Sequence, residues 1–252
     1  MTGFRNRHLI LLMGLLIFWA SGSACTSTER KVLPPDVLLK RGKKELKNDN
    51  FEDAQKTLTQ LMEDSPDSKE RIIAQLLLAE AHYRQEQWEE AKFNFNRFVE
   101  LYPAHRLAPR AQYQKGMTDF EQIDISIRDQ SFTHSAKAEF EKLIRIYPKS
   151  SYAKKAEQKI QECVDHLANN QLEIGRFYFR THSYQSAILR FKAILEDYPE
   201  QQFRDEVIYL LGESYFEEGN KEDARIFFRK LLQEYPRSEF TQDARSRLRR
   251  WD

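Results

Sequence analysis

The sequence predicts an all-α fold made of repeated helix pairs, and three observations carry this prediction. Its 252 residues include only 8 Gly and 8 Pro, about half the usual share, which disfavours folds rich in strands and turns. Charged residues make up 31% and hydrophobic residues 40%, in a mixture rich in the strong helix formers Ala, Leu, Glu, Lys and Arg. The third observation is a residue pattern that recurs five times. A formal net charge of +1 lacks the strong basic bias of most nucleic-acid binders, so no nucleic acid is expected as a partner.

The first segment, residues 1–24, is predicted to be a signal peptide. Arg5 and Arg7 precede an apolar run over residues 9–20, and small residues follow, which is the order of a secretory signal. The apolar run is shorter than the roughly 20 residues that a membrane-spanning helix needs. Cleavage is therefore the preferred interpretation, and an uncleaved anchor is its alternative.

Cys25 is predicted to be the acylated first residue of a mature lipoprotein. A Cys directly after Ser-Ala resembles a bacterial lipobox, although Gly22 stands where lipoboxes usually carry Leu. Ordinary cleavage with Cys25 as a bystander is the alternative. Residues 25–35 are expected to form a polar tether that ends in a stiff Pro pair. Thr26 after the Cys, in lipoproteins of this type, implies sorting to the outer membrane, on its periplasmic face.

Five copies of one pattern follow between residues 36 and 252. Each copy ends in a Pro, with an Ala twelve positions before it and a large apolar residue four positions after that Ala. The three residues are Ala54, Leu58 and Pro66; Ala91, Phe95 and Pro103; Ala136, Phe140 and Pro148; Ala187, Phe191 and Pro199; and Ala224, Phe228 and Pro236. Because residues four apart share a helix face and Pro cannot continue a helix, each copy predicts a helix that its Pro ends.

A small residue marks an earlier helix in each copy. It stands twelve positions before the Ala as Gly42, Ala79, Gly175 and Gly212, and twenty positions before it as Gly116. A small side chain lets two helices approach closely, and we expect the Ala of the second helix to be its contact. This is the tetratricopeptide (TPR) pattern. The sequence therefore predicts a TPR-type α-solenoid of five helix-turn-helix repeats with a concave groove.

Two irregularities interrupt the spacing. Pro148 and Gly175 are 27 positions apart where three other copies have 13, and an excess of 14 residues is close to four whole helical turns. We therefore expect one long helix over residues 151–181. The third copy has eight extra residues within 123–135, whose Asp, Ser and Thr side chains indicate a loop.

The chain is expected to end in a C-terminal capping helix. Residues 238–251 are rich in Arg, and Leu248 and Trp251 offer apolar contacts to the last repeat. The solenoid then divides into residues 36–149, which hold repeats one to three, and residues 150–252, which hold the long connecting helix, repeats four and five, and the cap.

The motifs of common catalytic sites are absent from the sequence. It contains no glycine-rich phosphate loop, zinc-protease helix motif or nucleophile elbow. Cys163 and His166 would share a helix face, but two ligands do not make a zinc site, and a buried Cys beside a surface His is the preferred interpretation. No enzymatic activity, metal or cofactor is expected.

The candidate binding residues lie on the groove side of the first helices. They combine cations with aromatic rings: Lys43, Lys47, Tyr83, Arg84, Tyr113 and Phe120. Cations and rings in a concavity would suit an extended peptide with a terminal carboxylate and aromatic side chains. The alternative is that the rings pack between repeats.

The whole pattern resembles the BamD family, the outer-membrane lipoproteins of the β-barrel assembly machinery. The resemblance covers residues 25–252 and is most specific at residues 116–118, 128–130 and 136–148. It implies that residues 36–149 receive the C-terminal targeting signals of unfolded outer-membrane proteins. It also implies that residues 150–252 dock the BamA-type barrel subunit, and that other assembly-complex lipoproteins are partners.

Two arginines match family positions associated with contacts to the barrel subunit. They are Arg97 and Arg190, of which Arg190 is preferred, and exposed helix residues without a partner are the alternative. Residues 210–216 also resemble the CpoB family, periplasmic TPR adaptors that coordinate envelope constriction with peptidoglycan synthesis. That adaptor role is the second functional hypothesis.

Overall fold

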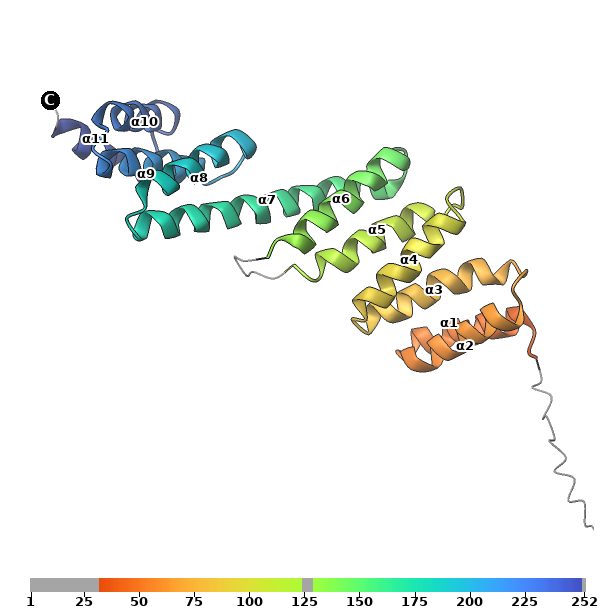
Figure 1. Ribbon diagram of the computed structural model, residues 1–252. Helices are drawn as coiled ribbons and strands as arrows, with labels where there is room; N and C mark the ends of the chain where they lie inside the picture. The colour runs from red at the N-terminus through yellow and green to blue at the C-terminus, as the bar shows by residue number, and fades with distance from the viewer. Residues whose placement is uncertain (1–31, 124–128, 251–252) are drawn as a thin grey trace, which may run out of the picture. The chain divides into compact units, whose positions relative to one another are not determined.

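The computed structural model describes residues 32–123 and 129–250 of the 252-residue chain. Residues from Leu33 onward belong to one compact unit. The predicted signal peptide, Cys25, most of the tether and Trp251 lie outside the described residues. The prediction of an all-α fold is confirmed: within the described ranges the chain forms eleven α-helices and no strand (Figure 1).

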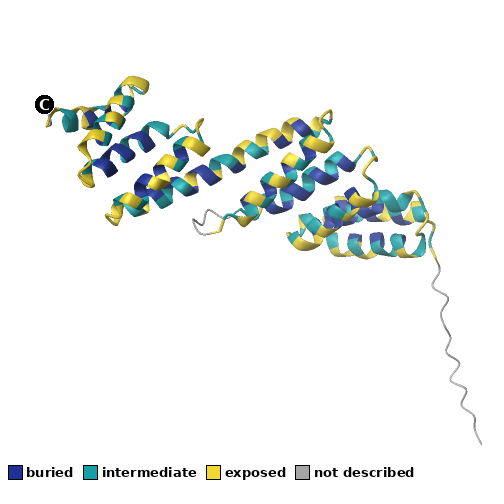
Figure 2. Cartoon of the chain, turned by 45° about the horizontal axis from the view of Figure 1, so that its top comes forward, coloured by how far each residue is buried: buried dark blue, intermediate teal, exposed yellow. Residues whose placement is uncertain are grey.

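The eleven helices follow one another in antiparallel pairs. They are α1 (Pro35–Lys47), α2 (Phe51–Asp64), α3 (Glu70–Arg84), α4 (Trp88–Leu101), α5 (Ala108–Phe120), α6 (Ser131–Ile146), α7 (Ser151–Arg180), α8 (Tyr184–Asp197), α9 (Arg204–Glu217), α10 (Lys221–Glu234) and α11 (Thr241–Arg249). Each helix packs against the one before it and the one after it. Buried residues gather where neighbouring helices face each other (Figure 2). The five pairs and the last helix form the predicted TPR-type α-solenoid.

In the four repeats whose small residue is Gly, this Gly of the first helix lies against the large apolar residue of the second helix. A Cβ atom added at Gly116 would lie 2.7 Å from Cε1 of Phe140, and one added at Gly212 would lie 2.8 Å from Cε1 of Phe228. Gly42 meets Leu58 in the same way. The Ala of the second helix is not the closest contact, contrary to the prediction, because the nearest atoms belong to the large side chain four residues later. In these four helix pairs, a Phe ring or a Leu side chain of the second helix therefore packs directly on the glycine backbone of the first.

The turn within a repeat requires a left-handed backbone at one position. Asp49, Glu86, His182 and Gly219, each five residues before the repeat's Ala, have φ of 59°, 58°, 59° and 82°. This conformation costs a residue with a Cβ atom roughly 1–2 kcal/mol and costs Gly little. Three repeats therefore carry a strained turn residue, and only the Gly at the fifth was noticeable in the sequence.

The long helix is confirmed as a single element. It spans 30 residues as α7, and Ser150 starts it by accepting a hydrogen bond at Oγ from the Tyr152 backbone N–H at 3.1 Å. Cys163 is buried in the apolar cluster of the third repeat, whereas Leu172 is buried in the cluster of repeats four and five. One continuous helix thus contributes to two hydrophobic cores.

The loop predicted for the third-repeat insertion is replaced by a helix at its end, and its residues 124–128 lie outside the described residues. α6 begins at Ser131, so the expectation of a loop up to residue 135 is wrong for its last five residues. Thr133 is buried, and Ser135 Oγ donates a hydrogen bond to Asp119 Oδ2 at 2.7 Å. Polar residues that often mark loops are here the first turn of a helix, held by contacts with α5.

The capping helix is shorter than predicted. α11 spans Thr241–Arg249 rather than 238–251, because the chain forms a turn before it, in which Phe240 stacks on Tyr209 with ring centroids 4.9 Å apart. Leu248 packs on the core of repeats four and five as expected.

Candidate functional site

Three of the predicted binding residues line one cavity between α1 and α3. Lys43, Leu46 and Lys47 come from α1, and Leu77, Glu80 and Arg84 come from α3; together they surround about 300 Å³. Lys43 and Lys47 lie four residues apart on one helix face because α1 continues unbroken to Lys47. Leu46 and Leu77 give this cavity an apolar base, and the charged side chains around them form its rim.

The charge of the cavity rim is predominantly positive. Arg84 Nη2 donates to Glu80 Oε1 at 3.2 Å, and Glu80 Oε2 also accepts from Arg110 at 2.8 Å. Among the described residues, Lys43 and Lys47 form no ion pair. The two ammonium groups are therefore available to an anionic group, and the apolar base is available to the side chains next to it.

The three predicted aromatic residues lie elsewhere, between helices. The Tyr83 ring packs edge-on against the Trp88 ring, with their centroids 5.2 Å apart, and the Tyr83 hydroxyl donates a hydrogen bond to Glu121 Oε1 at 3.2 Å. Burial first, then the nearby Glu121 carboxylate, raises the Tyr83 pKa above its ordinary value. Tyr113 lies 5.5 Å from both Phe140 and Tyr152.

The third ring, Phe120, lies 6.4 Å from Phe140, and Lys159 Nζ stands 4.0 Å above its centre. The structure thus brings Lys43, Lys47 and Arg84 together and places the three rings against side chains of neighbouring helices. A peptide-contacting role for any of the six residues stays a prediction.

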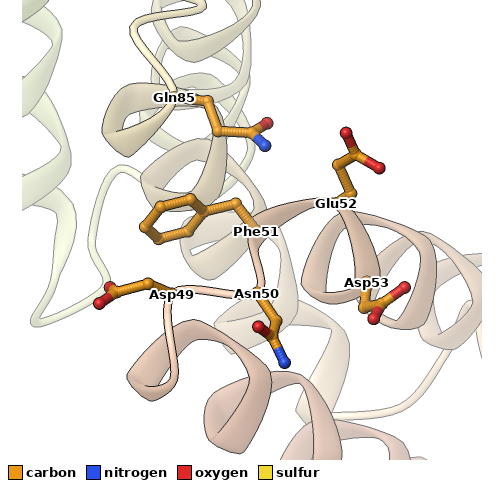
Figure 3. A pocket seen from close by; sticks show the side chains of 6 residues that line it. All are labelled: Asp49, Asn50, Phe51, Glu52, Asp53 and Gln85. Carbon is orange, nitrogen blue, oxygen red and sulfur yellow. The ribbon is translucent and has the colours of Figure 1, made fainter.

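A second hollow, not anticipated from the sequence, lies at the turn between α1 and α2. Figure 3 shows its lining: Asp49, Asn50, Phe51, Glu52, Asp53 and Gln85, around about 370 Å³. Asp49 Oδ1 lies 3.9 Å from Arg84 Nη1, so this acidic hollow adjoins the cationic one through a charge pair. The left-handed turn at Asp49 produces this arrangement, and a turn conformation of that kind carries little sequence signal without Gly.

The two predicted docking arginines are exposed and stand beside exposed apolar side chains. Arg97 lies on α4 between Phe93 and Leu101, four residues away on either side, which are 63% and 53% exposed. Arg190 follows Leu189, which is 70% exposed, and donates to Gln171 Oε1 at 3.0 Å. Large exposed apolar residues beside Arg are typical of protein interfaces.

These exposed apolar residues also recur in register. Phe93, Leu189 and Ile226 each stand two positions after the repeat's Ala, and Ile226 is 58% exposed. Their helix face points away from the partner helix, because the Ala and the residue four positions after it are fully buried. The recurrence of a large apolar residue two positions after the Ala is visible in the sequence, but it lies on the second helices and not on the groove side of the first helices.

Cys163 and His166 do not gather further ligands. Burial raises the pKa of the Cys163 thiol to about 11, and the His166 ring lies 6.4 Å from Phe120. Across the described ranges, no group of three or more His, Cys, Asp or Glu residues is placed to hold a metal ion. In the same ranges, no helix is both long enough and apolar enough to cross a membrane.

The repeat architecture defines a class, the all-α proteins built from TPR-type helix pairs. Comparison with known proteins narrows the class. The profile of the family YfiO, described as outer membrane lipoprotein, matches residues 32–226. The chain therefore belongs to this family, which is also that of the outer-membrane assembly factors named BamD.

Several relatives carry the name outer membrane protein assembly factor BamD. The one from Caulobacter vibrioides is 30% identical over 217 residues, which cover 84% of this chain and 71% of that protein. The one from Rickettsia prowazekii is 30% identical over 207 residues, covering 81% and 82%. The one from Haemophilus influenzae is 25% identical over 214 residues, covering 80% and 82%.

Solved structures show a likeness of fold alone. The TPR2AB domain of yeast Sti1, in a complex with an Hsp90 peptide, aligns with a TM-score of 0.44 and 15% identity over 80% of this chain and 78% of that one. The TPR domain of P58(IPK) aligns with a TM-score of 0.42 and 19% identity over 82% and 52%.

Proposed function

We propose that this protein is a non-catalytic lipoprotein subunit of the outer-membrane β-barrel assembly complex. In this role its first repeats, residues 36–149, bind the C-terminal signals of unfolded outer-membrane proteins, and residues 150–252 dock the BamA-type barrel subunit. Membership of the assembly-factor family supports the general role. The single observation that carries the binding proposal is the cavity that unites Lys43, Lys47 and Arg84.

The cavity suits the end of a peptide chain. A terminal carboxylate accepts hydrogen bonds from ammonium and guanidinium groups, and such charge-assisted bonds are stronger than neutral ones. Leu46 and Leu77 provide an apolar base against which the last side chains of the peptide would pack. Both groups belong to one hollow, so one short segment would reach them together.

A matched pair of variants on α1 tests this binding. Lys43→Glu/Lys47→Glu reverses the charges at the rim, whereas Lys40→Glu/Lys44→Glu makes the same charge change, with the same spacing, outside the cavity lining. Fluorescence anisotropy with a labelled outer-membrane-protein C-terminal peptide should show an affinity loss of about tenfold or more for the first variant. Equal losses for both variants would reduce the effect to net charge and contradict the site.

The docking proposal rests on the exposed outer residues of repeats four and five. Leu189 and Ile226 occupy the same repeat position, and Arg190 adjoins Leu189. Exposed apolar side chains that recur on one face are typical of protein interaction surfaces, and Arg is among the residues that contribute most to binding energy in interfaces. Arg97 with Phe93 and Leu101 offers a second surface of the same kind in repeat two.

Purification from membranes tests the docking proposal and its rival together. A tagged chain should recover a BamA-type barrel protein, and Leu189→Glu/Arg190→Glu should reduce the recovery at least fivefold. Arg106→Glu, an exposed Arg at the turn before α5, is the control. Recovery of a peptidoglycan synthase in place of the barrel protein would support the CpoB-like adaptor role instead.

The anchor of this subunit is proposed to be a lipid on Cys25. The support is the sequence, in which Cys25 follows Ser-Ala and precedes a polar stretch. Stable attachment through lipid needs a second acyl chain or another membrane contact, because a single chain binds reversibly. Cys25→Ser should abolish incorporation of labelled palmitate and release the protein from outer-membrane fractions. Unchanged labelling would exclude Cys25 as the acylated residue.

A further inference from the structure

A cavity of about 430 Å³ lies where the lengthened middle of α7 meets the turn between α8 and α9. From α7 come Gln161, Asp165 and Asn169, which are four residues apart and so share one helix face. From the turn come residues 200–203, with the sequence Glu-Gln-Gln-Phe. The added turns of α7 carry the three polar residues that form this wall, so the cavity results from the helix extension.

The amide side chains of this cavity are oriented toward Asp165. Gln161 Nε2 and Gln201 Nε2 both donate to Asp165 Oδ1 at 3.0 Å, and Asn169 Nδ2 donates to the Asp165 backbone oxygen at 2.8 Å. The acceptors left for a ligand are the amide oxygens, Asp165 Oδ2 and the Glu200 carboxylate, and Gln202 adds a fourth amide to the lining.

The character of the cavity follows from these acceptors and from its one ring. Its lining carries two carboxylates and no cationic side chain. Phe203 packs on the core of repeats four and five, so its ring is fixed in place. A ligand that complements the two carboxylates and the ring of this lining carries positive charge, donates several hydrogen bonds and has a flat face.

We propose that this cavity binds an arginine side chain of a partner polypeptide. A guanidinium group has five donors in a planar fork, no acceptor and a permanent positive charge. It also packs favourably on an aromatic face. This site is independent of the cationic cavity of α1 and α3, because it takes a side chain of opposite charge.

Three labelled peptides test the chemistry of the ligand. Each repeats Xaa-Gly-Ser three times, with Arg, Lys or citrulline at Xaa, and each is titrated against the full mature chain by fluorescence anisotropy. Citrulline has nearly the shape of Arg without its charge, so we expect it to bind at least about fivefold more weakly. The Lys peptide should fall in between, because its ammonium lacks the planar fork. Equal binding of the Arg and citrulline peptides would overturn the proposal.

Two variants test the place of binding. Asp165→Asn/Glu200→Gln removes both charges, and Glu157→Gln/Glu196→Gln removes two exposed charges from α7 and α8 outside the cavity. The first should weaken the Arg peptide at least about fivefold and the second should leave it unchanged. Gln202→Lys places a cation in the cavity while preserving the Asp165 hydrogen bonds, and it should weaken binding in a chain with an unaltered thermal unfolding curve.

Three results would contradict this location. Binding that is unchanged in both cavity variants would place the Arg peptide elsewhere on the chain. Equal weakening by the cavity pair and the control pair would show non-specific attraction only. Displacement of the Arg peptide by millimolar Ca²⁺, with no effect of Na⁺ at equal ionic strength, would identify the acceptors as a metal site instead.

Discussion

In the third and fifth repeats the same contact, a Phe ring on a Gly, joins the two helices, but the buried residues around this contact differ. Phe140 lies on Gly116 and Phe228 lies on Gly212 at almost equal distances. Around Gly116, however, α5 buries polar and charged side chains, namely Gln112, Lys115, Thr118 and Asp119. Around Gly212, α9 buries four apolar residues, Val207, Ile208, Leu211 and Tyr215, with Glu213 and Ser214 as its buried polar residues. The small-to-large contact therefore positions a helix pair, and the residues beside it are free to be ionic or apolar.

The charged groups of the third repeat connect several helices. Asp119 accepts a hydrogen bond from Lys92 of α4 at 2.7 Å and another from Ser135 of α6 at 2.7 Å. Lys115 lies 2.8 Å from Glu139 and donates to Asn96 at 2.9 Å. Burying a charge is costly unless it is paired, so these partners satisfy one another rather than simply adding stability.

The largest expected effect tests whether the ring contact is equally important in both repeats. Phe140→Ala and Phe228→Ala each remove a fully buried ring and should cost about 3–5 kcal/mol of unfolding free energy. Urea unfolding, with hydrogen exchange to locate the weakened repeat, measures both. A loss at Phe140 of less than half that at Phe228 would mean that the ionic groups, and not the ring, hold the third repeat.

A smaller effect is expected at the buried charge itself. Asp119→Asn keeps the shape but removes the charge that pairs with Lys92, and should cost about 1–3 kcal/mol. Glu213→Gln in the fifth repeat, which loses its pair with Arg247, is the comparison. Since Lys92 is 30% exposed and Arg247 26%, water relieves both cations, and similar losses are expected. An unchanged midpoint for Asp119→Asn would show that its hydrogen bonds alone suffice.

The ionic surroundings should also make the third repeat sensitive to acid. Burial by itself raises the Glu139 pKa, but the hydrogen bonds from Lys115 and Gln112 outweigh it, and the pKa lies below its ordinary value. A carboxyl group with a lowered pKa stabilises the folded state fully above its unfolded pKa of about 4.3. That contribution is lost as the pH falls through the folded pKa.

Hydrogen exchange as a function of pH measures this acid sensitivity. Protection of α5 and α6 should fall below about pH 4, and Glu139→Gln should flatten the profile. An equally steep profile in the variant would assign the acid loss to other groups.

The smallest expected effect concerns the strained turns. Glu86→Gly relieves a left-handed residue at φ 58° and should raise the unfolding free energy by about 1 kcal/mol or less, because added backbone freedom in the unfolded chain offsets part of the gain. Gly219→Ala should lower it by a similar amount. A loss of stability in Glu86→Gly would show that the Glu86 side chain makes a contact more valuable than the strain.

Much of the fold could be predicted from the sequence because it depends on local spacing. Residues twelve and four positions apart define helix faces, and an excess of 14 residues keeps the faces of α7 in register over about four turns. The start of α6 at Ser131 could not be predicted in this way. Polar residues there read as a loop, and only the contacts with Asp119 and the burial of Thr133 make them helical.

The candidate site was predictable in part for the same reason. Lys43 and Lys47 share a face of one helix, and the repeat places Arg84 on the next first helix. Tyr83, Tyr113 and Phe120 satisfied the same spacing rule, yet their rings turn into contacts with neighbouring helices. Side-chain direction within a repeat face depends on which neighbour offers an apolar surface, and spacing alone does not contain that information.

By itself the sequence determined the helices, their pairing, the long connecting helix and the family, because each depends on residue order and periodic spacing. Tertiary structure decided which large side chain lies on each Gly, which charges are buried together and which surfaces remain open. It also decided where the extended α7 forms a cavity with the turn after α8. These features depend on contacts between residues far apart in the chain, whose geometry is fixed only when the helices pack.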